Sequence, residues 1–222
     1  MDMAAEFSEM AIALLAEPDV DHTLDGIVLF AKESLGGDHA GIHIMQKQTI
    51  ETAAATDPVV AHASKLQEEL GEGPCLQAVW SHDTFVVGDA ATDERWPAYG
   101  PKAAELGMHS ILSVRLHTSA ETLGALNIYS REVREFSDDD VAQAHIFGQH
   151  ASVALATAKR EDGLRKAVDS RTAIGQAQGI LMERFGLTVD QAFAVLRRYS
   201  QTYNVKLRSV ADRLIETREL PE

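Results

Sequence analysis

The chain has 222 residues, 45% of them hydrophobic, and a formal net charge of −14 at pH 7, which fits a globular protein with a real core. Its apolar segments are short and interrupted by charge, so none reaches the roughly 20 residues of a membrane span, and its start lacks the basic region of a signal peptide. The single cysteine, Cys75, excludes an intramolecular disulfide and a thiolate metal cage. We therefore expect a cytoplasmic protein that does not associate with a membrane.

Helical spacing of apolar residues predicts two helices at the start of the chain, over residues 1–15 and 24–35, the second closed by Gly36 and Gly37. Three short β-rich runs follow, at residues 40–46, 50–56 and 84–89. A helix is expected over residues 58–70, between the second and third runs. Two further runs, 109–118 and 123–130, are separated by a short turn and predict an antiparallel hairpin. The pattern predicts an α+β domain with a largely antiparallel sheet.

A long helix is predicted from Ser137, because Ser137 and Asp140 form a capping-box pattern ahead of an apolar repeat. The repeat is a narrow stripe of mostly small residues at steps of three and four, which indicates close helix pairing. Its members are Val141, Ala144, Gly148, Ala151, Leu155 and Ala158. We interpret residues 137–170 as a stalk that pairs two copies of the chain. Proline is absent between Ser137 and Phe185, so Gly163, Gly175 and Gly179 are the expected interruptions.

Three short helices are expected in the last fifty residues, with breaks at Gly186 and Asn204 and a capping box from Thr188 to Gln191. The charge changes here as well. Residues 1–159 have a balance of −16, whereas residues 160–222 have a balance of +2. Such asymmetry is typical of two modules with different partners, although an acidic domain that merely stays soluble explains the first part equally well.

The last helices carry polar side chains of the kinds that contact phosphates and bases. The candidates for RNA binding are Gln178, Arg197, Ser200, Gln201, Asn204, Lys206 and Arg208. From composition alone, a solvated helical face is the alternative interpretation. The segment "IGQAQGILMERFGLTVDQAFAVLRRYSQTYNVKLRSVADRLIE" resembles the ANTAR domain, a three-helix RNA-binding module of bacterial antitermination regulators. The resemblance implies an ANTAR domain over residues 171–222 that grips paired hairpins in nascent RNA as a dimer.

The stretches "LGEGPCLQAVW", "RWPAY", "HSILSVRL" and "LGALNIYS" resemble the GAF domains that precede ANTAR modules in actinobacterial regulators. The resemblance implies a GAF-like sensor domain over residues 21–158, after an N-terminal helix within residues 1–20. GAF domains enclose a small-molecule pocket on one face of an antiparallel sheet, so a small-molecule ligand is a possible partner, but no residue can be assigned to it. A purely dimerising platform remains the alternative.

Cys75 is the one candidate nucleophile, because Pro74 would place it near a helix N-terminus. A methionine sulfoxide reductase of the GAF type would need a resolving cysteine, and the sequence has none. The histidines lack carboxylate or thiolate partners at chelating spacing, and no phosphate-binding glycine loop is present. We therefore expect neither a metal nor a cofactor nor an enzyme.

Taken together, the sequence predicts a cytoplasmic, dimeric regulator in which an acidic GAF-like sensor is joined by a helical stalk to an ANTAR-like RNA reader. Two alternatives stay open at this point. A DNA-binding helix-turn-helix protein would also have short helices and cations, although the acids in "LRSVADRLIE" would face phosphate. An enzyme built on the GAF-like domain would use Cys75.

Overall fold

The structure, a computed structural model, describes residues 3–46, 49–81, 83–134 and 136–219. The first two residues of the helix predicted over 1–15, and the last three of the domain predicted over 171–222, lie outside them. The chain divides into an N-terminal unit, residues 1–159, and a C-terminal unit, residues 160–222.

The N-terminal unit is built on a five-stranded antiparallel sheet in the order β2-β1-β5-β4-β3. Its strands are β1 (His39–Gln46), β2 (Thr49–Ala55), β3 (Phe85–Val87), β4 (Ser110–His117) and β5 (Thr122–Ser130). The predicted hairpin is confirmed, because β4 and β5 pair antiparallel from Ser110 opposite Ser130 to His117 opposite Thr122. The predicted α+β fold class is therefore also confirmed.

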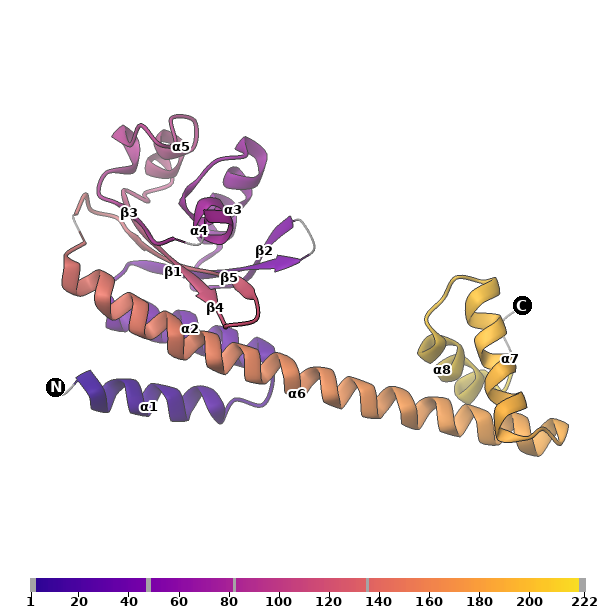
Figure 1. The fold of residues 1–222 in the computed structure, drawn as a ribbon. Coiled ribbons are helices and arrows are strands. Elements are labelled where there is room, and N and C mark those ends of the chain that lie inside the picture. The colour runs from indigo at the N-terminus through magenta and orange to yellow at the C-terminus, as the bar shows by residue number, and fades with distance from the viewer. Residues whose placement is uncertain (1–2, 47–48, 82, 135, 220–222) are drawn as a thin grey trace. The chain divides into compact units, whose positions relative to one another are not determined.

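Helices cover both faces of this sheet, as Figure 1 shows. On one side lie α1 (Met3–Leu15), α2 (Val20–Ser34) and the first part of α6 (Asp138–Phe185). On the other lie α3 (Pro58–Leu70), α4 (Pro74–Ser81) and α5 (Tyr99–Glu105). A short 3-10 turn, Ala90–Thr92, leads toward α5. The sequence analysis predicted α1, α2 and α3 but not α5, whose seven residues are too few to show a helical repeat.

Local signals explain where these helices begin and end. Asp19 caps α2 by accepting a hydrogen bond from the His22 amide, and Asp57 caps α3 in the same way through the Val59 amide. Helix α3 ends at Gly71, whose φ of 67° lies in the left-handed region that favours glycine. Each cap satisfies an amide or carbonyl group that the helix itself leaves unpaired.

The two faces of the sheet differ in polarity. The face toward α1, α2 and α6 is apolar and includes Ala40, Ile42, Leu112, Val114, Leu126 and Ile128, all at most 2% exposed. The alternate positions face α3, α4 and α5, and they include His43, Ser113, Asn127 and Tyr129, all 0% exposed. One face therefore forms the main hydrophobic core, whereas the other buries polar groups.

Helix α6 is one continuous helix of 48 residues that begins in the N-terminal unit and ends in the C-terminal unit. Ser137 and Asp140 form the predicted reciprocal hydrogen bonds at its start. The glycines expected to interrupt the helix do not do so. A Cβ at Gly163, Gly175 or Gly179 would meet no atom within 4 Å, so these glycines serve no close packing within the described chain.

The small-residue stripe of α6 requires a correction. Ala144, Ala151 and Leu155 are 0% exposed because they pack in the hydrophobic core of the N-terminal unit. A Cβ on Gly148 would lie 3.0 Å from Val114 Cγ1 on β4, so the glycine allows the helix to approach the sheet. These four residues cannot form a seam with a second copy while they line this core. Val141 and Ala158, at the two ends of the stripe, are half-buried.

The C-terminal unit contains the end of α6, α7 (Val189–Thr202) and α8 (Leu207–Thr217) (Figure 1). Thr188 and Gln191 form the predicted capping box. Gly186 and Asn204 adopt left-handed φ values of 63° and 50° at the two turns, as their residue types predict. The core of the unit is a small cluster from all three helices: Ala173, Ala177, Leu181, Ala192, Leu196, Val210, Ala211 and Leu214. Within the described residues, no helix is long and hydrophobic enough to cross a membrane.

Candidate nucleic-acid interface and buried polar cluster

A cluster of polar side chains is buried between the sheet and helices α3, α4 and α5 of the N-terminal unit. His43 on β1 holds its Nδ1 atom 2.9 Å from Ser64 Oγ on α3. Ser113 on β4 donates a hydrogen bond of 2.6 Å to Asn127 Oδ1 on β5. Gln67 on α3 accepts a hydrogen bond from the Cys75 amide at the start of α4. These contacts link β1 to α3, β4 to β5, and α3 to α4.

Five buried polar atoms on this side of the sheet have no hydrogen-bond partner within the described residues: His43 Nε2, Trp96 Nε1, Tyr99 Oη, Asn127 Nδ2 and Tyr129 Oη. The register of the sheet places His43 near Asn127. Gly41 on β1 pairs with Asn127 on β5, and His43 Nε2 lies 3.8 Å from the point where a Cβ on Gly41 would be. Trp96, Tyr99 and Tyr129 share one packed cluster. An unpaired polar group in a protein interior costs on the order of 1–3 kcal/mol. These unpaired atoms are therefore the groups that a polar ligand or water would satisfy.

The buried cluster favours neutral groups. Burial lowers the pKa of His43 to about 4, so the imidazole is neutral near pH 7. Burial also raises the pKa of the Tyr99 and Tyr129 hydroxyls. None of the five unpaired atoms belongs to a side chain that is charged near neutral pH. The site is therefore suited to a neutral molecule with hydrogen-bond acceptors.

Cys75 belongs to this cluster and does not resemble a nucleophile. Its side chain is 2% exposed, and burial raises the pKa of its thiol to about 12, an effect that the neighbouring Asn127 side chain only partly offsets. A thiol with such a pKa is protonated at neutral pH and cannot attack a substrate readily. Its burial is that of a structural thiol.

The sequence contains a signal for this cluster. In "HAGIHI" and "LNIYS", polar or small residues alternate with apolar ones, which is the pattern of a strand with one solvated face. The structure shows instead that helices cover that face. Alternation identifies the two faces of a strand but does not reveal which of them a later segment will cover.

The predicted RNA-binding residues lie in two places in the C-terminal unit. Arg197 and Gln201 are exposed one turn apart on α7, and Asn204, Lys206 and Arg208 follow at the turn into α8. Gln178 lies on α6 and donates a hydrogen bond of 3.1 Å to the Val189 carbonyl at the start of α7. It is thus separated from the α7–α8 turn by about 20 Å along α7. The structure brings six of the seven residues together and leaves Gln178 apart.

Some of these side chains have structural partners. Ser200 donates a hydrogen bond of 2.7 Å to the Val205 carbonyl, which fastens the turn between α7 and α8. Arg208 Nε lies 3.4 Å from Asp212 Oδ2 one turn further along α8. Arg197, Gln201 and Lys206 are exposed, and no side-chain hydrogen bond or ion pair to another described residue occupies them. These three side chains are therefore available to a partner.

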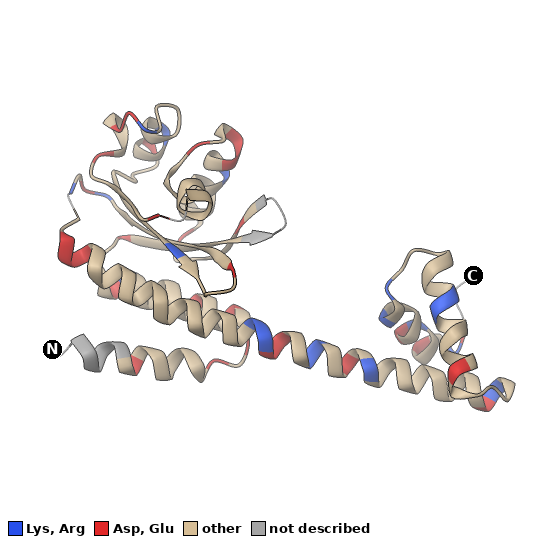
Figure 2. Ribbon diagram, in the orientation of Figure 1, with Lys and Arg blue, Asp and Glu red and all other residues tan. Residues whose placement is uncertain are grey.

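The surface around this turn is positive although the protein as a whole is strongly acidic. From Gln191 to Ala211 the sequence contains four cations and no Asp or Glu. Figure 2 shows basic and no acidic residues along the second half of α7 and the loop that leads into α8. Local charge of this kind attracts phosphate, whereas the N-terminal unit would repel it.

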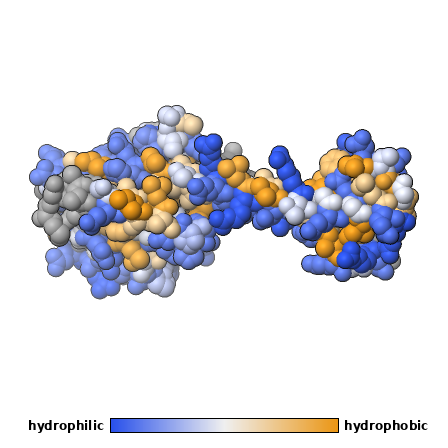
Figure 3. Space-filling model, turned by 90° about the horizontal axis from the view of Figure 1, so that it is seen from below, coloured by the Kyte–Doolittle hydropathy of each residue, from blue (hydrophilic) through white to orange (hydrophobic). Residues whose placement is uncertain are grey.

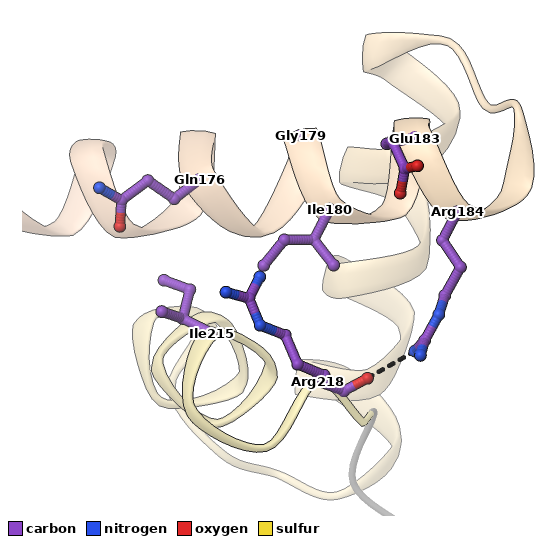
Figure 4. A pocket seen from close by; sticks show the side chains of 7 residues that line it. All are labelled: Gln176, Gly179, Ile180, Glu183, Arg184, Ile215 and Arg218. Atoms are coloured by element: carbon purple, nitrogen blue, oxygen red, sulfur yellow. Dashed lines mark hydrogen bonds between the residues drawn. The ribbon is translucent and has the colours of Figure 1, made fainter.

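A hollow of about 660 Å³ lies between the last turns of α6 and α8, as Figure 4 shows. It is lined by Gln176, Gly179, Ile180, Glu183, Arg184, Ile215 and Arg218. Arg184 donates a hydrogen bond to the Arg218 carbonyl at one side of it. Glu183 stands beside the two arginines, so the lining has mixed charge and is less suited to phosphate than the acid-free segment.

Comparison with known proteins divides the chain in the same way. The GAF domain family matches residues 17–156, and the ANTAR domain family matches residues 162–215. No curated protein sequence matches the chain.

Solved structures resemble the N-terminal part of the chain. The GAF domain of a phosphoenolpyruvate-protein phosphotransferase from Coxiella burnetii has 21% identity and a TM-score of 0.58, over 73% of this chain and 98% of that one. The free methionine-R-sulfoxide reductase from Neisseria meningitidis, solved with its substrate, has 17% identity and a TM-score of 0.58, over 72% and 91% of the two chains. At these identities the likeness shows a shared fold alone.

Proposed function

The chain belongs to the GAF domain family and carries an ANTAR domain after it, and from this premise we propose that it is a signal-responsive regulator that binds RNA hairpins in nascent transcripts and prevents termination. The GAF domain is the sensor and the ANTAR domain is the RNA reader. One observation of this chain supports the reader most directly. The positive segment from Gln191 to Ala211 is free of acids in a protein of net charge −14.

RNA suits this surface for physical reasons. Sequence-specific RNA recognition uses unpaired loop bases, which short helices can reach, together with contacts to the phosphates. Arg197, Lys206 and Arg208 supply cations, whereas Gln201 and Asn204 supply neutral donors and acceptors. We assign phosphate contacts to the first group and base contacts to the second. Ser200 and Gln178 have backbone partners, so their contribution is to hold the turns that present this surface.

The sensor ligand we propose is a small, neutral, polar molecule in the buried cluster between the sheet and α3, α4 and α5. Its acceptor atoms would take hydrogen bonds from Trp96 Nε1, Asn127 Nδ2 and the tyrosine hydroxyls, which have no partner within the described residues. Binding would relieve the cost of these unpaired groups. A ligand with full charge is disfavoured because none of these five groups offers a countercharge.

We propose that the protein acts as a homodimer and that the contact uses the exposed side of α1 and α6 instead of the small-residue stripe. Ile12 and Val153 are 67% and 63% exposed, and Leu15 is 63% exposed. Figure 3 shows hydrophobic atoms gathered on this underside of the N-terminal unit. A cavity of about 260 Å³ between the two helices is lined by Ala11, Leu15, Gln149, His150, Val153 and Ala154. Burying these side chains against a second copy would remove apolar surface from water.

The test of RNA binding is the salt dependence of affinity. An RNA with two adjacent hairpins, taken from RNA that copurifies with the protein, is titrated at several salt concentrations against Arg197→Ala, Lys206→Ala and Arg208→Ala. Each lost phosphate contact should weaken binding and reduce the slope of log K against log salt by about 0.7 to 0.9. Gln201→Ala and Asn204→Ala should alter preference among loop sequences at an unchanged slope.

The control variants are Glu183→Gln and Glu216→Gln, because loss of an acid cannot remove a phosphate contact. If the three arginine and lysine variants bind like the parent with the same slope, the segment is solvated surface and the assignment fails. A duplex DNA of the same sequence serves as competitor. Stronger binding to the duplex would favour the helix-turn-helix alternative.

A further inference from the structure

Two tyrosines, one on α7 and one at its C-terminal cap, form a stacked pair at the surface of the C-terminal unit. Tyr199 and Tyr203 are one helical turn apart, their ring centroids lie 5.8 Å from each other, and their planes are inclined by 21°. Tyr199 is half-buried against the hydrophobic core of the unit, whereas Tyr203 is 46% exposed. The inner ring is thus held by packing, and the outer ring presents aromatic surface to solvent.

The pair borders a hollow of about 350 Å³ whose lining combines aromatic, cationic and hydroxyl groups: Val195, Arg198, Tyr199, Thr202 and Tyr203. Arg198 is exposed, and no hydrogen bond or ion pair to another described residue occupies its guanidinium. A planar guanidinium and an aromatic ring are the two kinds of side chain on which nucleic-acid bases stack. Thr202 adds a hydroxyl that can donate to or accept from a base edge.

The position of the hollow decides which occupant it suits. It lies within the segment from Gln191 to Ala211, which contains no acid. Arg198 is three residues from Gln201, so the two are neighbours on the surface of α7 and the hollow adjoins the surface assigned to RNA. An apolar peptide would need a broad hydrophobic lining, and Val195 is the only aliphatic residue in this one. The lining therefore fits a flat, polar-edged ring in an anionic chain.

We propose that Tyr203, backed by Tyr199 and flanked by Arg198, is a stacking platform for an unpaired base of the bound RNA. The proposal rests on the proposed RNA-binding function and extends it to residues that were not among the predicted contacts. Stacking on Tyr203 accepts any base, because every base has an aromatic face. Loop preference then comes from neighbouring groups such as Gln201 and Thr202.

The experiment uses the full-length protein and the two-hairpin RNA, with 2-aminopurine placed in turn at each unpaired position. Stacking on the parent protein should quench the fluorescence at one position per hairpin. Tyr203→Ala should abolish that quenching and weaken binding about 5- to 160-fold, the range found for base-stacking aromatics. The salt slope should stay unchanged because no cation is removed. Tyr203→Phe retains the ring and should bind and quench like the parent.

Three controls separate the possible failures. The helical circular dichroism of Tyr203→Ala must match that of the parent, which we expect because Tyr203 is not part of the unit's buried core. An abasic nucleotide at the quenched position should weaken parent binding but leave Tyr203→Ala binding unaffected. If the parent binds the RNA while Tyr203→Ala binds equally well, the platform is overturned and the RNA-binding function stands. If the parent binds no RNA, both proposals fail.

Discussion

At the scale of single residues, the most informative side chains are the polar ones buried between the sheet and helices α3, α4 and α5. Asn127 and Tyr129 lie on β5, the central strand of the sheet, where a sheet covered by helices usually carries aliphatic residues. Their unpaired atoms remain costly unless a ligand or water satisfies them. These atoms are the groups that the ligand we propose would satisfy.

His43 allows a test of this environment through pH. Its pKa is lowered from 6.5 to about 4 by burial, so the folded state binds fewer protons than the unfolded state between these values. Its contribution to stability is complete above pH 6.5 and is lost as the pH falls toward 4. Between pH 7.5 and pH 5 this loss should be about 2 kcal/mol.

Urea denaturation of the parent and of His43→Asn, measured at both pH values, isolates this contribution because other titrating groups are common to both proteins. Asparagine can keep a polar atom near Ser64 Oγ and cannot be protonated in this range. We expect the variant to lose about 2 kcal/mol less than the parent on acidification. Equal losses in the two proteins would contradict the view that His43 is neutral in the folded protein.

At the scale of elements, residue patterns predicted most helices and strands because the signals are local. Ser137, Thr188 and Gly186 mark helix ends through groups only a few residues away, and the structure places helix ends beside each of them. Local signals do not show which other element a helix face packs against. The stripe from Ala144 to Leu155 was predicted to pair two copies of the chain, but it packs on the sheet of its own chain. Periodicity predicts which face of a helix is buried, but it does not predict which element covers that face.

The dimer contact that we propose gives a prediction with a matched pair of substitutions on α6. Val153→Arg places a cation on the exposed side and should yield monomers of unchanged stability in analytical ultracentrifugation. Leu155→Arg places the same cation in the core and should destabilise the N-terminal unit by on the order of several kcal/mol. A dimer of Val153→Arg that is as tight as the parent would show that the contact lies elsewhere.

At the scale of the whole molecule, α6 is the only covalent connection between the sensor and the reader, because it runs without interruption from Asp138 to Phe185. We expect ligand and RNA to be coupled through it. Coupling of this kind is reciprocal, so RNA should change ligand affinity by the factor by which ligand changes RNA affinity.

Insertions between Gly163 and Leu164 test whether the coupling depends on the rotational phase of α6. Seven extra residues turn the following segment by only about 20°, whereas two extra residues turn it by about 200°. The ligand for this experiment is a metabolite that raises the melting temperature of the parent protein. We expect the effect of this ligand on RNA affinity to survive the seven-residue insertion. The two-residue insertion should abolish it. Equal coupling in both variants would exclude a mechanism that depends on helix phase.

The middle of α6 has a consequence for how firmly the two units can be coupled. Between Arg160 and Asp169 nearly every side chain is exposed, and Gly163 adds a residue with poor helix propensity. Local contacts such as the ion pair between Asp162 and Lys166 contribute little at an exposed site. The free energy of local opening is therefore expected to be lowest here, and the backbone amides should exchange with deuterium faster than those at either end of the helix. The coupling free energy between ligand binding and RNA binding that α6 can carry therefore cannot exceed the free energy that keeps this segment helical.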